Sequence, residues 1–280
     1  MLDNNFHYNP LQTRNQNNDK EPAKTTNASE KVKTKSEISW VELMFIIVAG
    51  MLFVFALTAR IIYEYRTDDN SNMEVVVGSC TFKNNVLIKY DGSESIVNIP
   101  TYYEIDGEKY GITEIDDEVF YHRSEIEEIY MPNQIVKTGY FSFQYCENLR
   151  KIILSDKLEL LGDSCFWGCT KLEEIHLPAS LQKIDAYAFW GTAIKEIDIP
   201  EAVKEIRLGA FNQCRQLETV YMRSNELIET SFTQVYQVFS NCPSLKKIYV
   251  PEHLVEKYKT AEYWSLYADK FEAIGGANNA

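Results

Sequence analysis

The stretch LEEIHLPASLQKIDAYAF, residues 172–189, decides the fold because its pattern returns along most of the chain. Phenylalanine recurs at steps of 23, 23, 23, 22 and 28 residues, at Phe120, Phe143, Phe166, Phe189, Phe211 and Phe239. Three residues after four of them stands a cysteine, at Cys146, Cys169, Cys214 and Cys242. A fixed period in the twenties that apolar residues carry is typical of a solenoid, in which stacked coils bury one shared core.

Each coil contains the pattern Leu-x-x-Ile-x-Leu-Pro, most fully in LEEIHLP (172–178) and IKEIDIP (194–200). The fourth and sixth positions share one side of a strand, which we expect to face the core, whereas positions three and five face outward. Proline ends the strand because it cannot donate to a ladder. A second apolar pair follows, such as Leu181 and Ile184. The sequence therefore predicts a mainly β, parallel solenoid.

The outward positions form two columns, which are the candidate binding surface. Position five gives Tyr130, Ile153, His176, Asp198, Tyr221 and Tyr249; position three gives Glu128, Lys151, Glu174, Glu196, Thr219 and Lys247. Tyrosine is enriched where protein surfaces make contact, and a solvated face needs neither tyrosine nor isoleucine. The alternative is that these apolar residues only satisfy strand propensity and cross-strand packing.

Segments of different character flank the repeats. Residues 74–111 alternate short β-rich runs with Asn-Asn and Asp-Gly turns, which predicts an N-terminal β cap. Residues 251–274 show helix-like spacing, which predicts a C-terminal helical cap over the last coil. The remaining predicted boundaries are a disordered cytoplasmic tail at 1–38, a transmembrane helix at 39–63, a linker at 64–73, the repeats at 112–250 and a tail at 275–280.

The run LMFIIVAGMLFVFALTA, residues 43–59, holds 17 residues without a charge, and the apolar body continues to Tyr63. This length suits a single membrane-spanning helix at residues 43–63, if Arg60 snorkels. Lys24, Lys31, Lys33 and Lys35 precede the uncharged run, whereas only Arg60 and Arg66 follow it before Asp68 and Asp69. This bias predicts a single-pass cell-membrane protein with its N-terminus in the cytoplasm and its repeats outside. A cleaved signal peptide is the alternative, but its basic region would exceed 40 residues.

The net negative charge argues against polyanionic partners. The chain carries 41 acidic and 28 basic residues and a net charge of −13. Residues 67–280 alone hold 34 acidic and 20 basic side chains, a balance of −14. Such a region repels nucleic acid and anionic membrane surfaces, so we expect neither as a partner of the repeats.

Catalytic and metal-binding patterns are missing from the sequence. The four histidines, His7, His122, His176 and His253, lie far apart, and no nucleophile or phosphate-binding motif occurs. Cys165 and Cys169 have no second cysteine pair at zinc spacing. We therefore predict a protein that is not an enzyme, needs no cofactor or metal, and keeps its turn cysteines as buried free thiols.

The repeats and both of their ends resemble the BspA-like leucine-rich repeat family. The resemblance rests on LIKYDGSESIVNIP (87–100), on turns such as AFNQC (210–214) and on the ending YVPEHLVEKYK (249–259). It implies a microbial surface protein and, as in some members, an adhesin. We therefore expect a membrane-anchored, extracytoplasmic protein that binds a protein or glycan partner. The alternative is a structural or signalling scaffold of the cell envelope, in which the cytoplasmic tail contacts a cytoplasmic partner.

The charge bias around residues 43–63 makes the topology testable. Protease added to spheroplasts should remove the repeats and leave a small fragment that contains the N-terminal tail, because only the repeats are outside. Immunoblotting with an N-terminal tag measures this. Protection of the repeats, or a mature N-terminus near Arg60, would contradict the predicted orientation.

Overall fold

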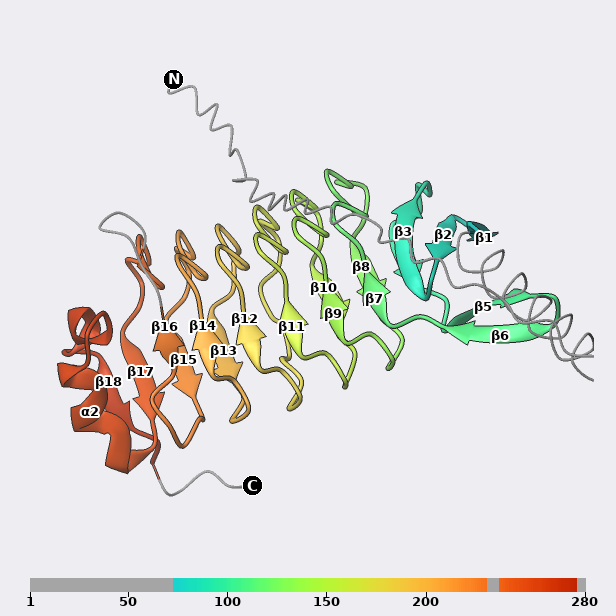
Figure 1. Ribbon diagram of the computed structural model, residues 1–280. Helices are drawn as coiled ribbons and strands as arrows, with labels where there is room; N and C mark the ends of the chain where they lie inside the picture. Colours follow the sequence, from blue (N-terminus) through green and yellow to red (C-terminus); the bar gives the residue numbers. More distant parts are fainter. Residues whose placement is uncertain (1–72, 231–236, 276–280) are drawn as a thin grey trace, which may run out of the picture. The chain divides into compact units, whose positions relative to one another are not determined.

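The computed structural model divides the chain into two units, Met1–Thr58 and Ala59–Ala280, and it describes residues 73–230 and 237–275 of the second. The described residues form a mainly β parallel solenoid of about seven turns with little helix, as predicted. Successive coils stack side by side, each contributing short strands (Figure 1).

One short strand from each coil joins a continuous sheet, built from the second apolar pair of the repeat. Its parallel strands are β3 (Val86–Tyr90), β7 (Glu114–Ile115), β9 (Lys137–Thr138), β11 (Leu160–Leu161), β12 (Lys183–Ile184), β14 (Glu205–Ile206) and β16 (Glu229–Thr230). Antiparallel β1 (Val75–Val77) and β2 (Cys80–Lys83) extend this sheet beyond β3. Leu161, Ile184 and Ile206 are fully buried, so the strands are held by the core they cover.

The strands from the Leu-x-x-Ile-x-Leu pattern, here called the outer strands, form two further parallel sheets. The first contains β4 (Ile96–Asn98), β8 (Glu128–Tyr130) and β10 (Lys151–Ile153); the second contains β13 (Glu196–Ile199), β15 (Thr219–Met222), β17 (Lys247–Val250) and β18 (Phe271–Ala273). Ile129, Ile152 and Ile197 point inward and are buried. The predicted alternation of inward and outward positions is therefore confirmed for these strands.

The outer strands do not stack without a break. Residues 172–178, where the repeat pattern is most complete, carry no strand, so β10 and β13 end two separate sheets. A paired strand here would set Glu174 beside Glu196, but β14 and β16 pair with Glu205 beside Glu229, so like charge alone does not explain the break. Glu174 instead lies 3.0 Å from the ring of His176.

An antiparallel hairpin, β5 (Tyr102–Ile105) and β6 (Glu108–Gly111), follows β4. Its turn residues Asp106 and Gly107 have φ of 52° and 82°, the left-handed pair that a two-residue hairpin loop requires. The predicted Asp-Gly turn is therefore confirmed.

A ladder of phenylalanine rings runs through the core. The six repeating phenylalanines are buried, and adjacent ring centroids lie 5.0 to 5.5 Å apart in stacked geometry. Tyr90 continues the ladder 5.0 Å from Phe120, and Tyr267 does so 5.4 Å from Phe239. Each aromatic contact is worth about 0.5–1.5 kcal/mol beyond the burial of its area.

The turn cysteines form a second ladder beside the rings. Each thiol donates a hydrogen bond to the carbonyl oxygen of the preceding coil's phenylalanine: Cys146 to Phe120 (3.1 Å), Cys169 to Phe143 (3.2 Å), Cys214 to Phe189 (3.1 Å) and Cys242 to Phe211 (3.0 Å). All six cysteines of the chain lie among the described residues and are free. Cysteine at this position therefore links neighbouring coils as well as filling space.

The segment after the last coil is less helical than its spacing predicts. It contains η1 (Glu252–Leu254), the six-residue helix α2 (Val255–Thr260) and η2 (Trp264–Tyr267), and Phe271 lies in strand β18 rather than on a helix. The segment satisfies open backbone groups of the last coil. Ile228 N–H donates to the Tyr258 hydroxyl (3.0 Å), and the Trp264 indole N–H donates to Ile228 O (2.8 Å).

The predicted transmembrane helix at residues 43–63 lies outside the described residues, as does the tail before it. Within 73–230 and 237–275, no helix has the length and apolar character needed to cross a membrane.

The turn that carries the phenylalanine has left-handed backbone at two positions in each of the first five coils, and the second of these positions is also left-handed in the sixth, at Asn241. The second of these positions is glycine at Gly168 (φ 74°) and Gly191 (φ 71°), but His122 (58°), Tyr145 (59°) and Gln213 (58°) adopt the same conformation. The left-handed conformation costs a residue with a Cβ about 1–2 kcal/mol of conformational energy. The sequence alone does not indicate this strain.

Gly191→Ala isolates that backbone cost. A Cβ at Gly191 meets no atom within 4 Å, so the only penalty is the positive φ. We expect the free energy of unfolding to fall by about 1 kcal/mol in urea titrations. Gly275→Ala is the matched control, because its Cβ also meets nothing and its φ is not positive. Equal stability of the two variants would contradict the left-handed turn.

The buried thiols of Cys80, Cys146 and Cys165 predict alkaline destabilisation. Burial raises the pKa of Cys80 and Cys165 to about 11, and that of Cys146 to about 12, from an ordinary value of 9.0. Because the folded pKa lies above the unfolded one, this stabilisation is complete below about pH 9 and is lost as the pH rises towards 11–12. Urea midpoints should therefore be level up to about pH 8.5 and fall above it.

Cys165→Ala should flatten the slope of stability against pH above pH 9, because it removes one titrating group. A wild-type midpoint that stays level to about pH 11 would show that the thiols do not resist ionisation.

Candidate functional site

The outward side chains of the outer strands form the candidate site, called here the outer face. Ten of the twelve predicted residues lie on outer strands in matching register. Glu128 lies beside Lys151 and Tyr130 beside Ile153; Thr219 lies between Glu196 and Lys247, and Tyr221 lies between Asp198 and Tyr249. Glu174 and His176 lie in the unpaired stretch between the two sheets, with side chains 77% and 87% exposed. The structure therefore brings the predicted residues together as two groups.

The first group is held by contacts across its strands. The Tyr130 hydroxyl donates to Glu128 Oε2 (2.7 Å), and Lys151 Nζ donates to the Tyr130 hydroxyl (3.1 Å) while lying 5.1 Å from its ring centroid. Arg150 lies 2.7 Å from Glu128. The hydrogen bond from Tyr130, followed by the charge of Arg150, lowers the pKa of Glu128. Ile153 remains 42% exposed beside this network.

The second group combines a stacked tyrosine pair with a bidentate ion pair. The Tyr221 and Tyr249 rings stack with centroids 5.0 Å apart and planes 17° apart. Arg223 places two guanidinium nitrogens on the two carboxylate oxygens of Asp198, at 2.6 and 2.7 Å, and its guanidinium lies 5.4 Å from the Tyr221 ring. Both ring positions are therefore fixed before any partner arrives, which lowers the entropic cost of binding.

The structure adds residues that the sequence columns missed. Strand β4 places Ile96 and Asn98 beside Glu128 and Tyr130. At the other end β18 places Glu272 beside Tyr249, where it accepts a hydrogen bond from Lys247. The run SIVNIP (95–100) already matches the alternation and the final proline of the repeat, so β4 could have been found; β18 has no such signature.

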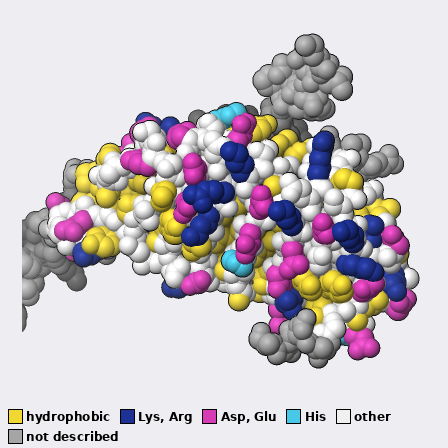
Figure 2. Space-filling model, turned by 180° about the vertical axis from the view of Figure 1, so that it is seen from behind, with side chains coloured by type: hydrophobic (Ala, Val, Ile, Leu, Met, Phe, Trp, Pro, Cys, Tyr) yellow, Lys and Arg dark blue, Asp and Glu magenta, His cyan; other side chains and the backbone are white. Residues whose placement is uncertain are grey.

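Chemically, the outer face is a mixed contact surface. Lys, Arg, Asp and Glu side chains alternate with hydrophobic ones over one face of the molecule (Figure 2). Within the described ranges no three His, Cys, Asp or Glu side chains come together as a metal site. Paired charges around aromatic side chains favour recognition of another surface, since the charges set specificity and the rings supply contact area.

The repeats are similar in sequence and fold to known proteins. Residues 113–236 match the family model described as the BspA type leucine rich repeat region, in six copies. A leucine-rich repeat protein from Bacteroides ovatus is 30% identical with a TM-score of 0.52, over 64% of this chain and 46% of that protein. The chain thus spans about half the length of that relative.

The T. pallidum leucine rich repeat protein is similar in fold, with 21% identity and a TM-score of 0.52 over 72% of this chain and 95% of that one. No curated protein matches the chain.

Proposed function

Since residues 113–236 are six copies of a BspA-type leucine-rich repeat, we propose that this chain binds a protein partner on its outer face. Leucine-rich repeat solenoids are typically non-enzymatic binding scaffolds, and we propose the same for this chain. The observation that carries the proposal is the stacked pair Tyr221–Tyr249 beside the Arg223–Asp198 ion pair. Partly buried, fixed tyrosines and an arginine are the residues that dominate protein interfaces.

Cross-strand packing alone does not account for Ile153. It remains 42% exposed on the outer face even though the aromatic Tyr130 lies beside it on the neighbouring strand. An exposed isoleucine gains contact area only when another surface covers it. We therefore place the interface across both groups of the outer face.

We further propose that residues 43–63 anchor the chain in the cell membrane, with the repeats outside the cytoplasm, and that the partner is met in adhesion or recognition at the cell surface. The support is the uncharged run and the lysines before it. A glycan partner at the outer face is the competing possibility, and a binding screen that includes glycans separates the two.

The two ends of the solenoid fit the role of covers. Trp264, Tyr258 and Phe271 are buried against the last coil, and Tyr103 stacks on Phe82 at the other end, 5.6 Å between centroids. We propose that residues 74–111 and 251–274 act as caps, because a solenoid without covered ends exposes its core.

The second candidate function is a structural or signalling scaffold of the envelope, in which the cytoplasmic tail binds the partner. Deletion of residues 1–37 distinguishes it: partner binding survives the deletion if the outer face is the site, and is lost if the tail is.

Tyr221→Ala with Tyr249→Ala tests the outer face. The double variant should bind its partner at least about fivefold more weakly, a loss of about 1 kcal/mol or more, because the two rings supply central contact area. Binding of the full chain to a panel of immobilised extracellular matrix proteins, read by surface plasmon resonance, measures this. Loss of the stacked pair should cost about 1 kcal/mol of folding stability, so the variant remains folded.

Tyr102→Ala with Tyr140→Ala is the matched control, because both tyrosines are exposed (43% and 54%) and lie off the outer strands. Tyr221→Phe with Tyr249→Phe keeps the stacked rings and should bind nearly as well as wild type. Undiminished binding by the double alanine variant would exclude this face as the site.

A further inference from the structure

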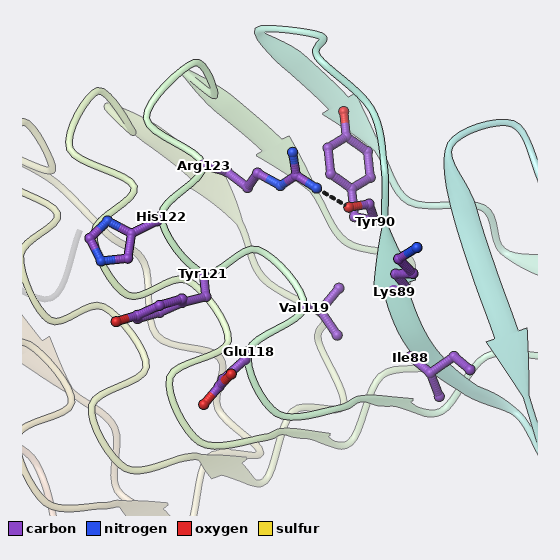
Figure 3. A pocket seen from close by; sticks show the side chains of 8 residues that line it. All are labelled: Ile88, Lys89, Tyr90, Glu118, Val119, Tyr121, His122 and Arg123. Atoms are coloured by element: carbon purple, nitrogen blue, oxygen red, sulfur yellow. Dashed lines mark hydrogen bonds between the residues drawn. The ribbon is translucent and has the colours of Figure 1, made fainter. Parts of the chain in front are cut away.

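The residues three places after the repeating phenylalanines form one column of equivalent positions, and two of its members are not cysteine. In chain order the column is Arg123, Cys146, Cys169, Thr192, Cys214 and Cys242. Arg123 begins the column without a thiol, and its guanidinium donates to the carbonyl oxygen of Tyr90 instead (Figure 3). Thr192 interrupts the column in the fourth coil. Two pairs of thiols on adjacent coils are therefore left, Cys146 with Cys169 and Cys214 with Cys242.

The thiols of Cys214 and Cys242 lie in contact across adjacent coils. The Gln213 N–H donates to the carbonyl oxygen of Ser240 at 2.9 Å, which holds the two turns together directly beside the cysteines. Equivalent residues of stacked coils lie about 5 Å apart, within the Cα separation of about 4.4–6.8 Å that a disulfide spans. The two cysteine side chains are hydrogen-bonded to one another. The two sulfurs can therefore be joined with little backbone movement.

Cys242 is the accessible member of this pair. All six cysteines of the chain lie among the described residues; five of them are buried, and Cys242 alone is partly exposed. It lines a hollow of about 590 Å³, together with Arg215, Asn241 and Pro243 among others. A small disulfide in solution can therefore reach the sulfur of Cys242.

This pair also ionises more easily than the other pair in the column. Burial raises the pKa of Cys146 to about 12 and that of Cys169 well above its ordinary value of 9.0. Burial acts in the same direction on Cys214, but hydrogen bonds from Cys242 and from the Thr192 hydroxyl, 3.3 Å away, outweigh it and lower the pKa of Cys214. The hydrogen bond to Cys214 raises the pKa of Cys242, so the pair loses one proton and keeps the other. Because a thiolate is the form that attacks a disulfide, only this pair is reactive.

We propose that Cys214 and Cys242 form a reversible disulfide, with a low-molecular-weight disulfide such as that of glutathione as the oxidant. The shared proton passes from Cys242 to Cys214, and the Cys242 thiolate attacks one sulfur of the oxidant, which releases the first glutathione thiolate. Cys214 then loses its proton to solvent and attacks Cys242 Sγ, which releases the second glutathione thiolate. Two protein thiols are oxidised by two electrons, and one small disulfide is reduced to two thiols.

The bridge joins the two coils that carry the stacked tyrosines. Tyr221 on β15 follows Cys214 by seven residues, and Tyr249 on β17 follows Cys242 by seven residues. A covalent link between the two turns restricts the unfolded chain as well as the folded one, so oxidation stabilises this end of the solenoid. The disulfide does not require the outer face to bind a partner.

The test equilibrates the purified full chain, reduced beforehand, with glutathione disulfide and glutathione in stepped ratios. Remaining thiols are blocked with N-ethylmaleimide in denaturant, and tryptic peptides are analysed by mass spectrometry without reduction. Trypsin places the two cysteines in separate peptides, residues 208–215 and 224–246. We expect these two peptides to be linked in most molecules under oxidising ratios and separated again by excess glutathione. The oxidised protein should melt several degrees above the reduced one.

Cys146 and Cys169 are the internal control, because they are an adjacent pair in the same column but are completely buried. They should stay reduced at every ratio that links Cys214 to Cys242. Cys214→Ser should leave Cys242 as a mixed disulfide with glutathione, whereas Cys242→Ser should leave Cys214 unmodified, because only Cys242 is reached from solvent.

Three results would overturn the proposal: alkylation of all six thiols under excess glutathione disulfide, a Cys146–Cys169 link that forms as readily, or a mixed disulfide on Cys242 of the wild type that never resolves to the bridge. None of them bears on partner binding at the outer face, which the Tyr221 and Tyr249 variants report separately.

Discussion

Stacking of one phenylalanine per coil is the interaction on which the rest of this structure depends. A single coil of about 23 residues cannot bury its own apolar side, so each ring is covered only when the next coil supplies its neighbour at 5.0 to 5.5 Å. Tyr90 and Tyr267 end the ladder with rings that also belong to the flanking segments. The repeats and their ends thus share one continuous core.

The stacked core sets the spacing for everything outside it. Because the coils are held in register, side chains at equivalent positions meet across strands, and the outer face becomes a set of cross-strand pairs rather than independent residues. Tyr221 stacks on Tyr249, and Arg223 donates two hydrogen bonds to Asp198 of the preceding coil. The same pairing holds the side chains of the outer face in fixed positions.

The same regularity makes the exceptions informative. Residues 172–178 keep Ile175 buried but lose their strand, which separates the outer face into two groups. At the first turn Arg123 replaces the usual thiol, and its guanidinium donates to the carbonyl oxygen of Tyr90 instead. Both features arise where one coil departs from its neighbours, since a uniform stack would repeat the same surface along its whole length.

The periodicity of the sequence alone determined the solenoid, its inward and outward positions, and the inward placement of the turn cysteines. With a spacing of about 23 residues, equivalent residues of successive coils stack on one another and share the same surroundings. Tertiary structure decided the rest. The thiol bonds to phenylalanine carbonyls need atoms about 25 residues apart, and Phe271 lies in a strand because the last coil offers it an open edge. The hydrogen bond from Arg123 to the carbonyl oxygen of Tyr90 likewise exists only once the coils are stacked, since it joins residues 33 apart in the chain.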